Sequence, residues 1–600
     1  MQQETTSDKQ IVVIGGGPAG LTAAHELCKL GFHPIVLEKE NKVGGLSRTE
    51  SYKGFYFDLG GHRFFTKVKD VKQLWHETLN GEFLRRPRLS RIYYNRKFFS
   101  YPLKPFNALV GLGFWESTLI ILSYIKWQLF PYKVVDTFEE WVTNRFGRRL
   151  FQTFFKTYTE KVWGISCSAL KAEWAAQRIK DLSLKTALLS MFMKPKNTIQ
   201  TLIDEFDYPR LGPGLMWRTL SEGIERYNGH VRLGDDVVEI NRRGQRIESV
   251  VVSHHGTQET ISGRAFISSM PVTEFIKKLR PEPNREVIGA AAKLKYRDFL
   301  TVCLIVNKAD LFPDNWIYIH DPQVKVGRIQ NFKNWSPDMV PDQSKSSLGL
   351  EYFCTEGDEL WTMSDADLIE LGKREVGHIG LASYGDIEDG CVIRVPKSYP
   401  IYDADYREGL DTIRKFVDGL ENFQTVGRNG LHRYNNQDHA MLTGMLAVRN
   451  LALGERNDLW SVNTDQEYHE EIRDEVRVLT DNVAAAIDGV LTRVFLKLDR
   501  VAFGLSMGMA AGMLLFFATL ILVLKGGNVV GPNLQLLKQF FPGYSVSLSG
   551  SVLGLGYGLV VGFVGGWSFA FLRNSTLFLY MAVIHRRAEL YLLRKVLEYF

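Results

Sequence analysis

Apolar and polar positions near the start of the chain form a strand pattern that runs directly into a helix pattern. Residues 11–14 are apolar β-formers, a glycine-rich turn follows them, and apolar positions then recur at helical spacing. The turn contains Gly15, Gly17 and Gly20 in a G-x-G-x-x-G arrangement. These glycines allow a tight turn and let the backbone approach a pyrophosphate, whose charge then lies at a helix N-terminus. The pattern predicts a strand–turn–helix unit that binds a dinucleotide.

A second strand pattern, Pro34 to Leu37, ends at an acidic residue. Glu38 stands 18 residues after Gly20, the distance at which a carboxylate in such units accepts a hydrogen bond from a ribose hydroxyl. We therefore expect the adenine half of a dinucleotide to bind between the glycine turn and Glu38.

Later segments alternate between strand and helix patterns. Short aromatic strands from Trp75 to Tyr101 predict a small antiparallel sheet with a hairpin turn at Asn95–Arg96. Residues 106–131 are apolar but interrupted by Glu116 and Lys126, and the uninterrupted piece is too short to span a bilayer. Two interpretations of this stretch stay open, a core helix and a helix that lies on a membrane surface. The pattern is helical over 137–180 and strand-like over 229–270 and 295–400, and over 423–451 it predicts a strand and then a helix that starts near Asp438.

The C-terminal part contains two long uncharged stretches, 501–524 and 549–572, that meet the length criterion for transmembrane helices. A charged helix is expected before them, over 479–500. Basic residues flank the outer ends, whereas the connecting loop carries only Lys525 and Lys538, which predicts a cytoplasmic location for both long ends. Glycines recur every four residues in both stretches and predict close helix packing, either in a hairpin or between copies of the chain.

The composition and charge of the chain exclude some classes of protein. The apolar fraction of 45% and the charged fraction of 23% are those of a globular protein, and 600 residues predict more than one domain. A net charge of +6 without a dense basic run argues against nucleic acid as a partner. Five scattered cysteines fit a reduced compartment and predict no metal cluster. The polar N-terminus predicts no cleavable signal peptide.

Two further glycine motifs decide which dinucleotide is expected. The segments NKVGGLSRT, at 41–49, and FDLGGHRFF, at 57–65, frame an aromatic hairpin. Together they resemble the flavin contacts of the FAD amine oxidase and protoporphyrinogen oxidase superfamily, with Gly60 and Gly61 pressing against the isoalloxazine. The resemblance implies FAD as the cofactor. The residues implied to contact it are Gly15, Gly17, Gly20, Glu38, Lys39, Gly44, Gly45, Leu46, Arg48, Gly60, Gly61, His62, Val237, Arg428, Asn436 and Asp438.

The segment YTEKVWG, at 158–164, resembles a signature of the UDP-galactopyranose mutase family, and the similarity extends over roughly 1–455. It implies that Tyr158 and Trp163 line a sugar-nucleotide pocket, and that Arg328 binds the phosphate of the substrate. The alternatives are that the two aromatic residues only pack helices and that Arg328 is an exposed surface residue. The residues implied to act in catalysis are Arg328, Tyr434, Tyr399, Tyr158, Trp163 and His62.

The chain departs from the mutase pattern at two places. Asn436 replaces an aspartate of the family. A second phosphate-binding arginine, which the mutases carry on a lid, falls on Leu182, with Arg178, Lys180 and Lys185 nearby. A two-arginine clamp suits a diphosphate, so the departure favours a substrate with one phosphate.

The predicted fold class is α/β, with a Rossmann-type FAD-binding domain, an inserted mixed-sheet and helical substrate domain, and a two-helix transmembrane hairpin. The FAD domain is expected at 1–70, 229–285 and 421–455, the substrate domain at 71–228 and 286–420, a helical linker at 456–500, and a cytoplasmic helix at 573–600. The location expected is the bacterial inner membrane, with the catalytic domain in the cytoplasm.

The resemblance implies a flavin-dependent mutase that interconverts pyranose and furanose sugars through an adduct at flavin N5, in cell-surface glycan synthesis. Its substrate would be a phosphate-linked sugar, carried either by a polyprenyl chain or by a nucleotide. The transmembrane hairpin would dock a lipid-linked substrate or would only anchor the enzyme. The alternative function is an FAD-dependent oxidase or desaturase of the amine oxidase and protoporphyrinogen oxidase type.

Overall fold

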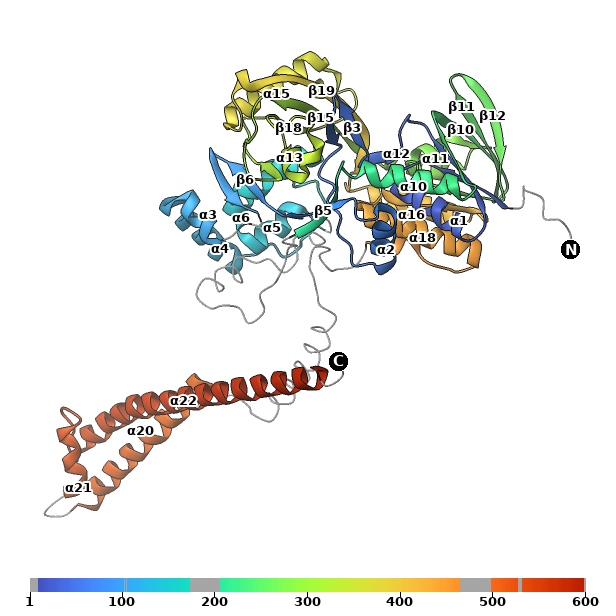
Figure 1. The fold of residues 1–600 in the computed structure, drawn as a ribbon. Helices are drawn as coiled ribbons and strands as arrows, with labels where there is room; N and C mark the ends of the chain where they lie inside the picture. The colour runs from blue at the N-terminus through green and yellow to red at the C-terminus, as the bar shows by residue number, and fades with distance from the viewer. Residues whose placement is uncertain are drawn as a thin grey trace. The chain divides into compact units, whose positions relative to one another are not determined.

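A computed structural model describes residues 9–101, 103, 105–172, 205–463, 498–526 and 531–597. The chain divides into two compact units, Met1–Ile472 and Arg473–Phe600. Figure 1 draws the elements of both. The predicted lid position Leu182 and its neighbours, as well as the charged helix expected over 479–500, lie mostly or wholly outside the described residues.

The first unit is built on a parallel five-stranded sheet with the order β20-β13-β1-β2-β9. Helices α1, α10 and α18 pack on it (Figure 1), and its central strands are almost fully buried. The sheet therefore joins three distant segments of the chain, which confirms the Rossmann-type domain. The bounds are β1 Gln10–Ile14, β2 His33–Glu38, β9 His230–Leu233, β13 Ala265–Ser268, β20 Phe423–Thr425, α1 Pro18–Lys29, α10 Gly214–Arg226 and α18 Gln437–Leu453.

Glycines allow two close approaches in this domain. A Cβ on Gly20 would lie 1.9 Å from the carbonyl oxygen of Gly15, so the third motif glycine lets α1 begin directly over the end of β1. A Cβ on Gly444 would lie 2.4 Å from the carbonyl oxygen of Ala19, so α18 crosses α1 at backbone contact. The N-terminus of α1 is thereby held at the end of the sheet.

A four-stranded sheet, with the order β12-β11-β10-β14, extends from this domain. Its β11–β12 hairpin carries His254, whose Nδ1 lies 2.6 Å from the buried carboxylate of Asp235. The histidine is therefore exposed and paired with a carboxylate. The bounds are β10 Asp235–Arg243, β11 Arg246–His254, β12 Thr257–Ser262 and β14 Leu279–Arg280.

The substrate domain is organised around a seven-stranded sheet with the order β19-β15-β18-β17-β16-β6-β7. Helix α15 packs on one face, over β15 and β19 (Figure 1), and the opposite face carries Arg328 and Glu351, which are register partners on β17 and β18. The bounds are β6 Ser90–Tyr94, β7 Lys97–Ser100, β15 Tyr296–Val306, β16 Trp316–Ile319, β17 Arg328–Asn331, β18 Ser346–Cys354, β19 Ile387–Pro400 and α15 Asp365–Ile379.

Two predictions for residues 75–101 need correction. Trp75 lies in helix α2, Lys69–Leu79, and not in a strand, because Val71, Leu74 and Leu79 share its buried face. The hairpin at Asn95–Arg96 forms as expected, but its strands are not a separate small sheet, since β6 pairs in parallel with β16. Strand β5, Phe83–Pro87, pairs instead with β8, Glu205–Pro209.

The expected helical segment forms a chain of short helices beside the sheet. Residues 106–131 form α3, Pro105–Leu112, and α4, Phe114–Leu129, and of the side chains of α4 only Ile120 is fully buried. The stretch is therefore not a core helix. Four elements follow, namely α5 Phe138–Phe146, α6 Arg148–Leu150, the π-helix η3 Phe151–Lys156, and α7 Thr157–Trp163, which contains most of the signature.

Shorter elements complete the first unit. The flavin-motif hairpin pairs β3 with β4. The remaining bounds are β3 Thr49–Tyr52, β4 Phe55–Asp58, α11 Val272–Lys278, α12 Arg285–Lys293, α13 Phe332–Trp335, α14 Glu359–Thr362, α16 Tyr406–Asp418 and α17 Gly427–Gly430.

The second unit is a helical hairpin of α20, Arg500–Lys525, and α22, Leu548–Leu597 (Figure 1). All of α20 and residues Leu548–Thr576 of α22 are long and apolar enough to cross a membrane, and only 17% and 22% of their most apolar windows are buried. Gly508 and Gly512 of α20 contact α22 at backbone distance, since an added Cβ would lie 2.7 Å from the carbonyl oxygen of Leu559 and 2.8 Å from that of Leu555. These glycines thus allow close packing of two helices of the same chain. Association of two copies of the chain through them stays a prediction.

Candidate functional site

The two glycine turns of the first domain lie against each other. The N–H of Gly44 donates to the carbonyl oxygen of Gly16 at 2.8 Å, and a Cβ on Gly45 would lie 3.2 Å from the Cα of Gly17. Helix α1 starts at this junction and has no side-chain cap, so its first N–H groups are available to an anion. A pyrophosphate fits this backbone cradle, which supports the expected roles of Gly15, Gly17, Gly20, Gly44 and Gly45.

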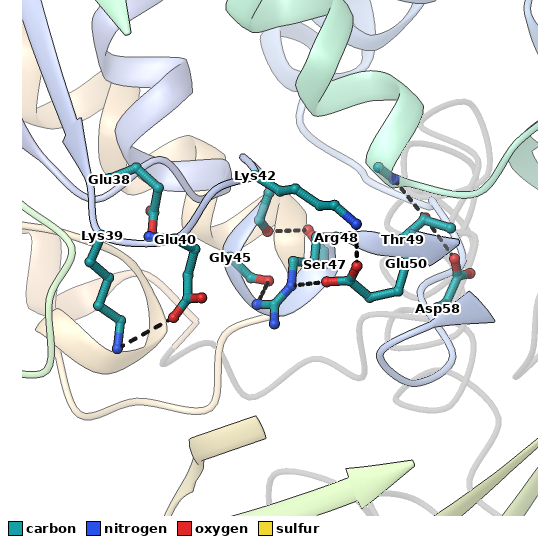
Figure 2. Close-up of polar contacts among 12 residues, drawn as sticks. Glu38, Lys39, Glu40, Lys42, Gly45, Ser47, Arg48, Thr49, Glu50 and Asp58 are labelled. Carbon is teal, nitrogen blue, oxygen red and sulfur yellow. Dashed lines mark hydrogen bonds and ion pairs between the residues drawn. The ribbon is translucent and has the colours of Figure 1, made fainter. Parts of the chain in front are cut away.

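Glu38 closes one side of the cradle (Figure 2). Its Oε2 accepts from the N–H of Gly16 at 2.6 Å and its Oε1 accepts from the N–H of Glu40 at 2.9 Å. Burial raises the pKa of this carboxyl. Each carboxylate oxygen has a second lone pair, so Glu38 has acceptor capacity left for ribose hydroxyls. Lys39 differs, because its side chain is 60% exposed and its Nζ lies 3.7 Å from Glu40.

Arg48 stabilises the second glycine turn through hydrogen bonds (Figure 2). Its Nη1 donates to the carbonyl oxygen of Gly45 at 3.2 Å, and its Nε donates to Glu50 at 2.7 Å. Leu46 packs against the aromatic core of the substrate domain. The segment therefore connects the FAD domain to the substrate domain.

The second glycine pair reaches the substrate-domain sheet. A Cβ on Gly60 would lie 3.7 Å from Nη2 of Arg328, and one on Gly61 would lie 3.0 Å from Nε2 of Gln330. Burial, together with Arg428 and Arg328, lowers the pKa of His62 to about 3. The imidazole is therefore neutral at neutral pH, and its Nδ1 lies 3.2 Å from the carbonyl oxygen of Gly60.

Arg328 is not an exposed surface residue. Its side chain is 17% exposed, and its Nε and Nη2 donate to the two carboxylate oxygens of Glu351 at 2.9 and 2.5 Å. Gln330 Nε2 donates to the same carboxylate at 2.8 Å. Burial opposes the charge of Arg328, but the carboxylate of Glu351 outweighs it and raises the pKa of the arginine. Arg328 Nη1 and the second proton of Nη2 are not engaged by Glu351 and can donate to a substrate oxygen.

Aromatic residues from three distant segments surround this ion pair. Tyr434 stacks on Tyr399 with ring centroids 5.5 Å apart, and Trp163 lies 6.3 Å from Tyr399. Tyr158 stacks on His320 at 4.8 Å. Burial raises the pKa of Tyr158, and the charge of Arg328 opposes this shift, which places the two residues within electrostatic reach. The structure therefore brings together all six residues expected to act in catalysis.

The closing segment supplies the remaining flavin candidates. The guanidinium of Arg428 lies over the ring of Tyr434, 4.6 Å from its centroid, and Nε donates to the carbonyl oxygen of Asn435 at 2.9 Å. Helix α18 begins at Gln437, as expected, with Asn436 at its N-cap and the buried Asp438 in its first turn. Val237 is buried in β10 and its carbonyl oxygen accepts from Lys278 at 2.5 Å.

Sequence reasoning missed Glu351, although a signal was present. It is the single charged residue inside the apolar strand LGLEYFC, and an isolated charge at a buried strand position indicates a buried pair. Tyr318 and His320 were also missed. Among the described residues no cluster of metal-binding side chains occurs. A surface cavity of about 560 Å³ beside α15, lined by Lys308, Lys373 and His378 among others, contains none of the predicted site residues.

Comparisons with known proteins agree with this geometry. A family model for flavin containing amine oxidoreductase matches residues 18–390. An L-amino acid oxidase of Crotalus durissus cumanensis is 33% identical over 115 residues, which are 17% of this chain and 23% of that protein. The chain thus aligns with about a quarter of the length of this curated relative.

Solved structures show the same fold at low sequence identity. A reduced UDP-galactopyranose mutase superposes with a TM-score of 0.67 at 21% identity, covering 76% of this chain and 98% of the mutase. A protein assigned as a protoporphyrinogen oxidase from Exiguobacterium sp. 255-15 gives a TM-score of 0.57 at 15% identity, covering 75% and 100%. Because the family model spans more than half of the chain, this protein belongs to the flavin-containing amine oxidoreductase family, with FAD as its cofactor and the fold of UDP-galactopyranose mutase.

Proposed function

We propose that the protein is an FAD-dependent mutase that interconverts ring forms of a phosphate-linked sugar. The observation that carries the proposal is the convergence of Arg328, Tyr158, Trp163, Tyr399 and Tyr434 beside the Gly60–His62 segment. Bound FAD supplies the electron-rich centre for the reaction, while the protein binds and orients the substrate.

Each side chain has a task that its position supports. Arg328 donates to one phosphate oxygen while Glu351 fixes the plane of its guanidinium. The hydroxyls of Tyr399 and Tyr434 donate hydrogen bonds, because burial raises the pKa of Tyr399 and keeps its proton in place. His62 stays neutral and adds no charge beside the flavin.

The carrier of the sugar is proposed to be a polyprenyl phosphate, handled at the cytoplasmic face of a bacterial inner membrane. The two apolar helices of the hairpin support membrane attachment. The first unit adds a second apolar surface on α3, α4 and the following turn. Its exposed members are Val110, Phe114, Trp115, Leu119, Leu122, Ile125, Leu129 and Phe130. An apolar helix face of this kind, with Lys126 and Lys133 beside it, fits an interfacial position on lipid.

The test uses the full chain in nanodiscs, with the flavin reduced by dithionite and no electron acceptor present. Polyprenyl-phosphate sugars and UDP-sugars are offered separately, and pyranose-to-furanose conversion is followed. Isomerisation without net consumption of reductant supports the mutase. Turnover of UDP-galactose at least as fast as any lipid-linked sugar would show that the hairpin serves only as an anchor.

The second candidate is an FAD-dependent oxidase or desaturase. The family match and the 115-residue similarity to an L-amino acid oxidase favour it. Glu351 also favours it, because the carboxylate neutralises the arginine expected to bind phosphate. Steady oxygen consumption with an amine or isoprenoid, and no isomerisation in the test above, would support the oxidase or desaturase function over the mutase function.

A further inference from the structure

Arg88 lies on the same face of the seven-stranded sheet as Arg328. Ser90, two residues after Arg88, is the register partner of Trp316, and Tyr318 is the register partner of Arg328. Because residues two apart on a strand share a face, Ser90, Trp316, Tyr318 and Arg328 lie on one surface across three strands. Arg88 precedes β6 in the chain, and its guanidinium lies over the ring of Trp316 on that surface. Ring contacts connect them, since Trp316 and Tyr318 lie 6.2 Å apart and Tyr318 lies 5.4 Å from Tyr158.

Hydrogen-bond donors on this surface lack partners. The atoms concerned are Nε and Nη2 of Arg88, Oγ of Ser90 and Nε1 of Trp316, and each is buried without a hydrogen-bond partner among the residues that the structure describes. The guanidinium of Arg88 lies between two rings, 5.6 Å from the centroid of Trp316 and 5.4 Å from that of Tyr101. A buried donor without a partner destabilises the folded protein unless a ligand satisfies it, so three residues with unsatisfied donors at one place indicate a ligand.

Arg91, on strand β6 just after Arg88, is an arginine with a structural role. Arg91 points to the other face and forms a bidentate pair with the buried carboxylate of Asp314, with contacts of 2.9 and 2.5 Å. Arg88 has no such carboxylate among the described residues. Its aromatic neighbours hold the guanidinium plane in place without occupying its donors.

We propose that Arg88, Ser90 and Trp316 form a second substrate subsite, which binds an oxyanion. All three offer donors, and the fork of an arginine matches a carboxylate or a phosphate bidentately. The inference rests on the proposed function, because it makes the substrate a sugar with two acidic groups. One is the phosphate at Arg328 and the other is a carboxylate or phosphate substituent at Arg88.

The experiment measures binding by calorimetry on the detergent-solubilised holoenzyme, without turnover. The probes are inorganic phosphate, glucuronate as a sugar carboxylate, and glucose as the uncharged control. R88Q is compared with R85Q, which removes a neighbouring arginine whose side chain is 73% exposed. We expect saturable binding of phosphate or glucuronate, a dissociation constant at least tenfold higher in R88Q, and a change below twofold in R85Q.

The identity of the tighter probe tells which acidic group the subsite takes. Equal binding by R88Q and R85Q, or no saturable binding of either oxyanion, would overturn the proposal. Flavin content reports folding, and if R88Q loses flavin, S90A takes its place with an expected several-fold weakening. Since no isomerisation is measured, failure of the mutase reaction would leave this result standing.

Discussion

Replacing Glu351 by glutamine tests whether the Arg328–Glu351 ion pair stabilises the folded protein by itself or depends on a bound substrate. The carboxylate of Glu351 is completely buried and accepts from Arg328 Nε, Arg328 Nη2 and Gln330 Nε2. Glutamine keeps the shape but removes the negative charge, so Arg328 is left as an unpaired buried cation. Breaking a buried pair from one side costs about 3–5 kcal/mol. The remaining amide oxygen still accepts one hydrogen bond worth about 1 kcal/mol, so E351Q should lose about 2–4 kcal/mol of stability.

The assay is denaturant unfolding of the holoenzyme in detergent, with flavin fluorescence as the readout. The matched control is E388Q, since Glu388 also pairs with a cation, Lys345, at 2.5 Å, but its side chain is 37% exposed. Exposed pairs contribute about 0–1 kcal/mol, so E388Q should unfold almost like the natural protein. Equal losses in E351Q and E388Q would refute the claim that the Arg328–Glu351 pair is a buried structural element.

The same variant tests the assignment of Arg328 to a phosphate. In E351Q an added anion can replace the missing carboxylate, and a ligand that binds only the folded state stabilises it. Saturating inorganic phosphate should therefore raise the unfolding midpoint of E351Q more than that of the natural protein. If phosphate stabilises both proteins equally, Arg328 does not face the phosphate subsite.

Three further outcomes are expected. Glu38→Ala should weaken FAD binding to the apoprotein by about 1.5–3 kcal/mol, measured by equilibrium dialysis, whereas Glu40→Ala should leave it within twofold. Gly508→Leu should separate α20 from α22, because an added Cβ already lies 2.7 Å from a backbone carbonyl, so aggregation in detergent should begin at a lower temperature than for Ser506→Leu. Burial, reinforced by Lys161, lowers the pKa of His320 to about 3. Because the folded protein binds this proton more weakly than the unfolded chain does, the free energy of unfolding decreases as the pH is lowered from about 6.5 to about 3. The decrease from pH 7 to pH 5, measured by urea unfolding, should be about 2 kcal/mol smaller in His320→Gln, and an equal decrease in both proteins would contradict the buried neutral ring.

The FAD domain could be predicted from the sequence because its signals are local. The strand, the turn with Gly15 and Gly20, and the acidic end at Glu38 stand within 30 residues, and each has a stereochemical cause. The structure confirms that β9, β13 and β20 return to this sheet. The helical hairpin was equally predictable, since length and glycine spacing are properties of single helices.

The substrate domain was harder to predict because its pairing is non-local. Strand β6 pairs with β16, which lies more than 200 residues later in the chain, and no short motif encodes that choice. The candidate site was hard to predict for the same reason. Arg328 was identified through a family resemblance, but its partner Glu351 comes from another strand, and the unpaired donors of Arg88 became visible only in the fold.

The charges around the site argue for an acidic substrate over an amine. The charged groups that act on His62, Tyr158 and Tyr399 include the cations Arg328 and Arg428 and the carboxylate of Glu351. His62 itself is held neutral, so these groups sum to a positive charge. The guanidinium of Arg88 adds to it on the same sheet face. A protonated amine would meet repulsion here, whereas a phosphate would restore neutrality in a buried place where charge is costly. The electrostatics thus support the proposal that the substrate is a phosphate-linked sugar.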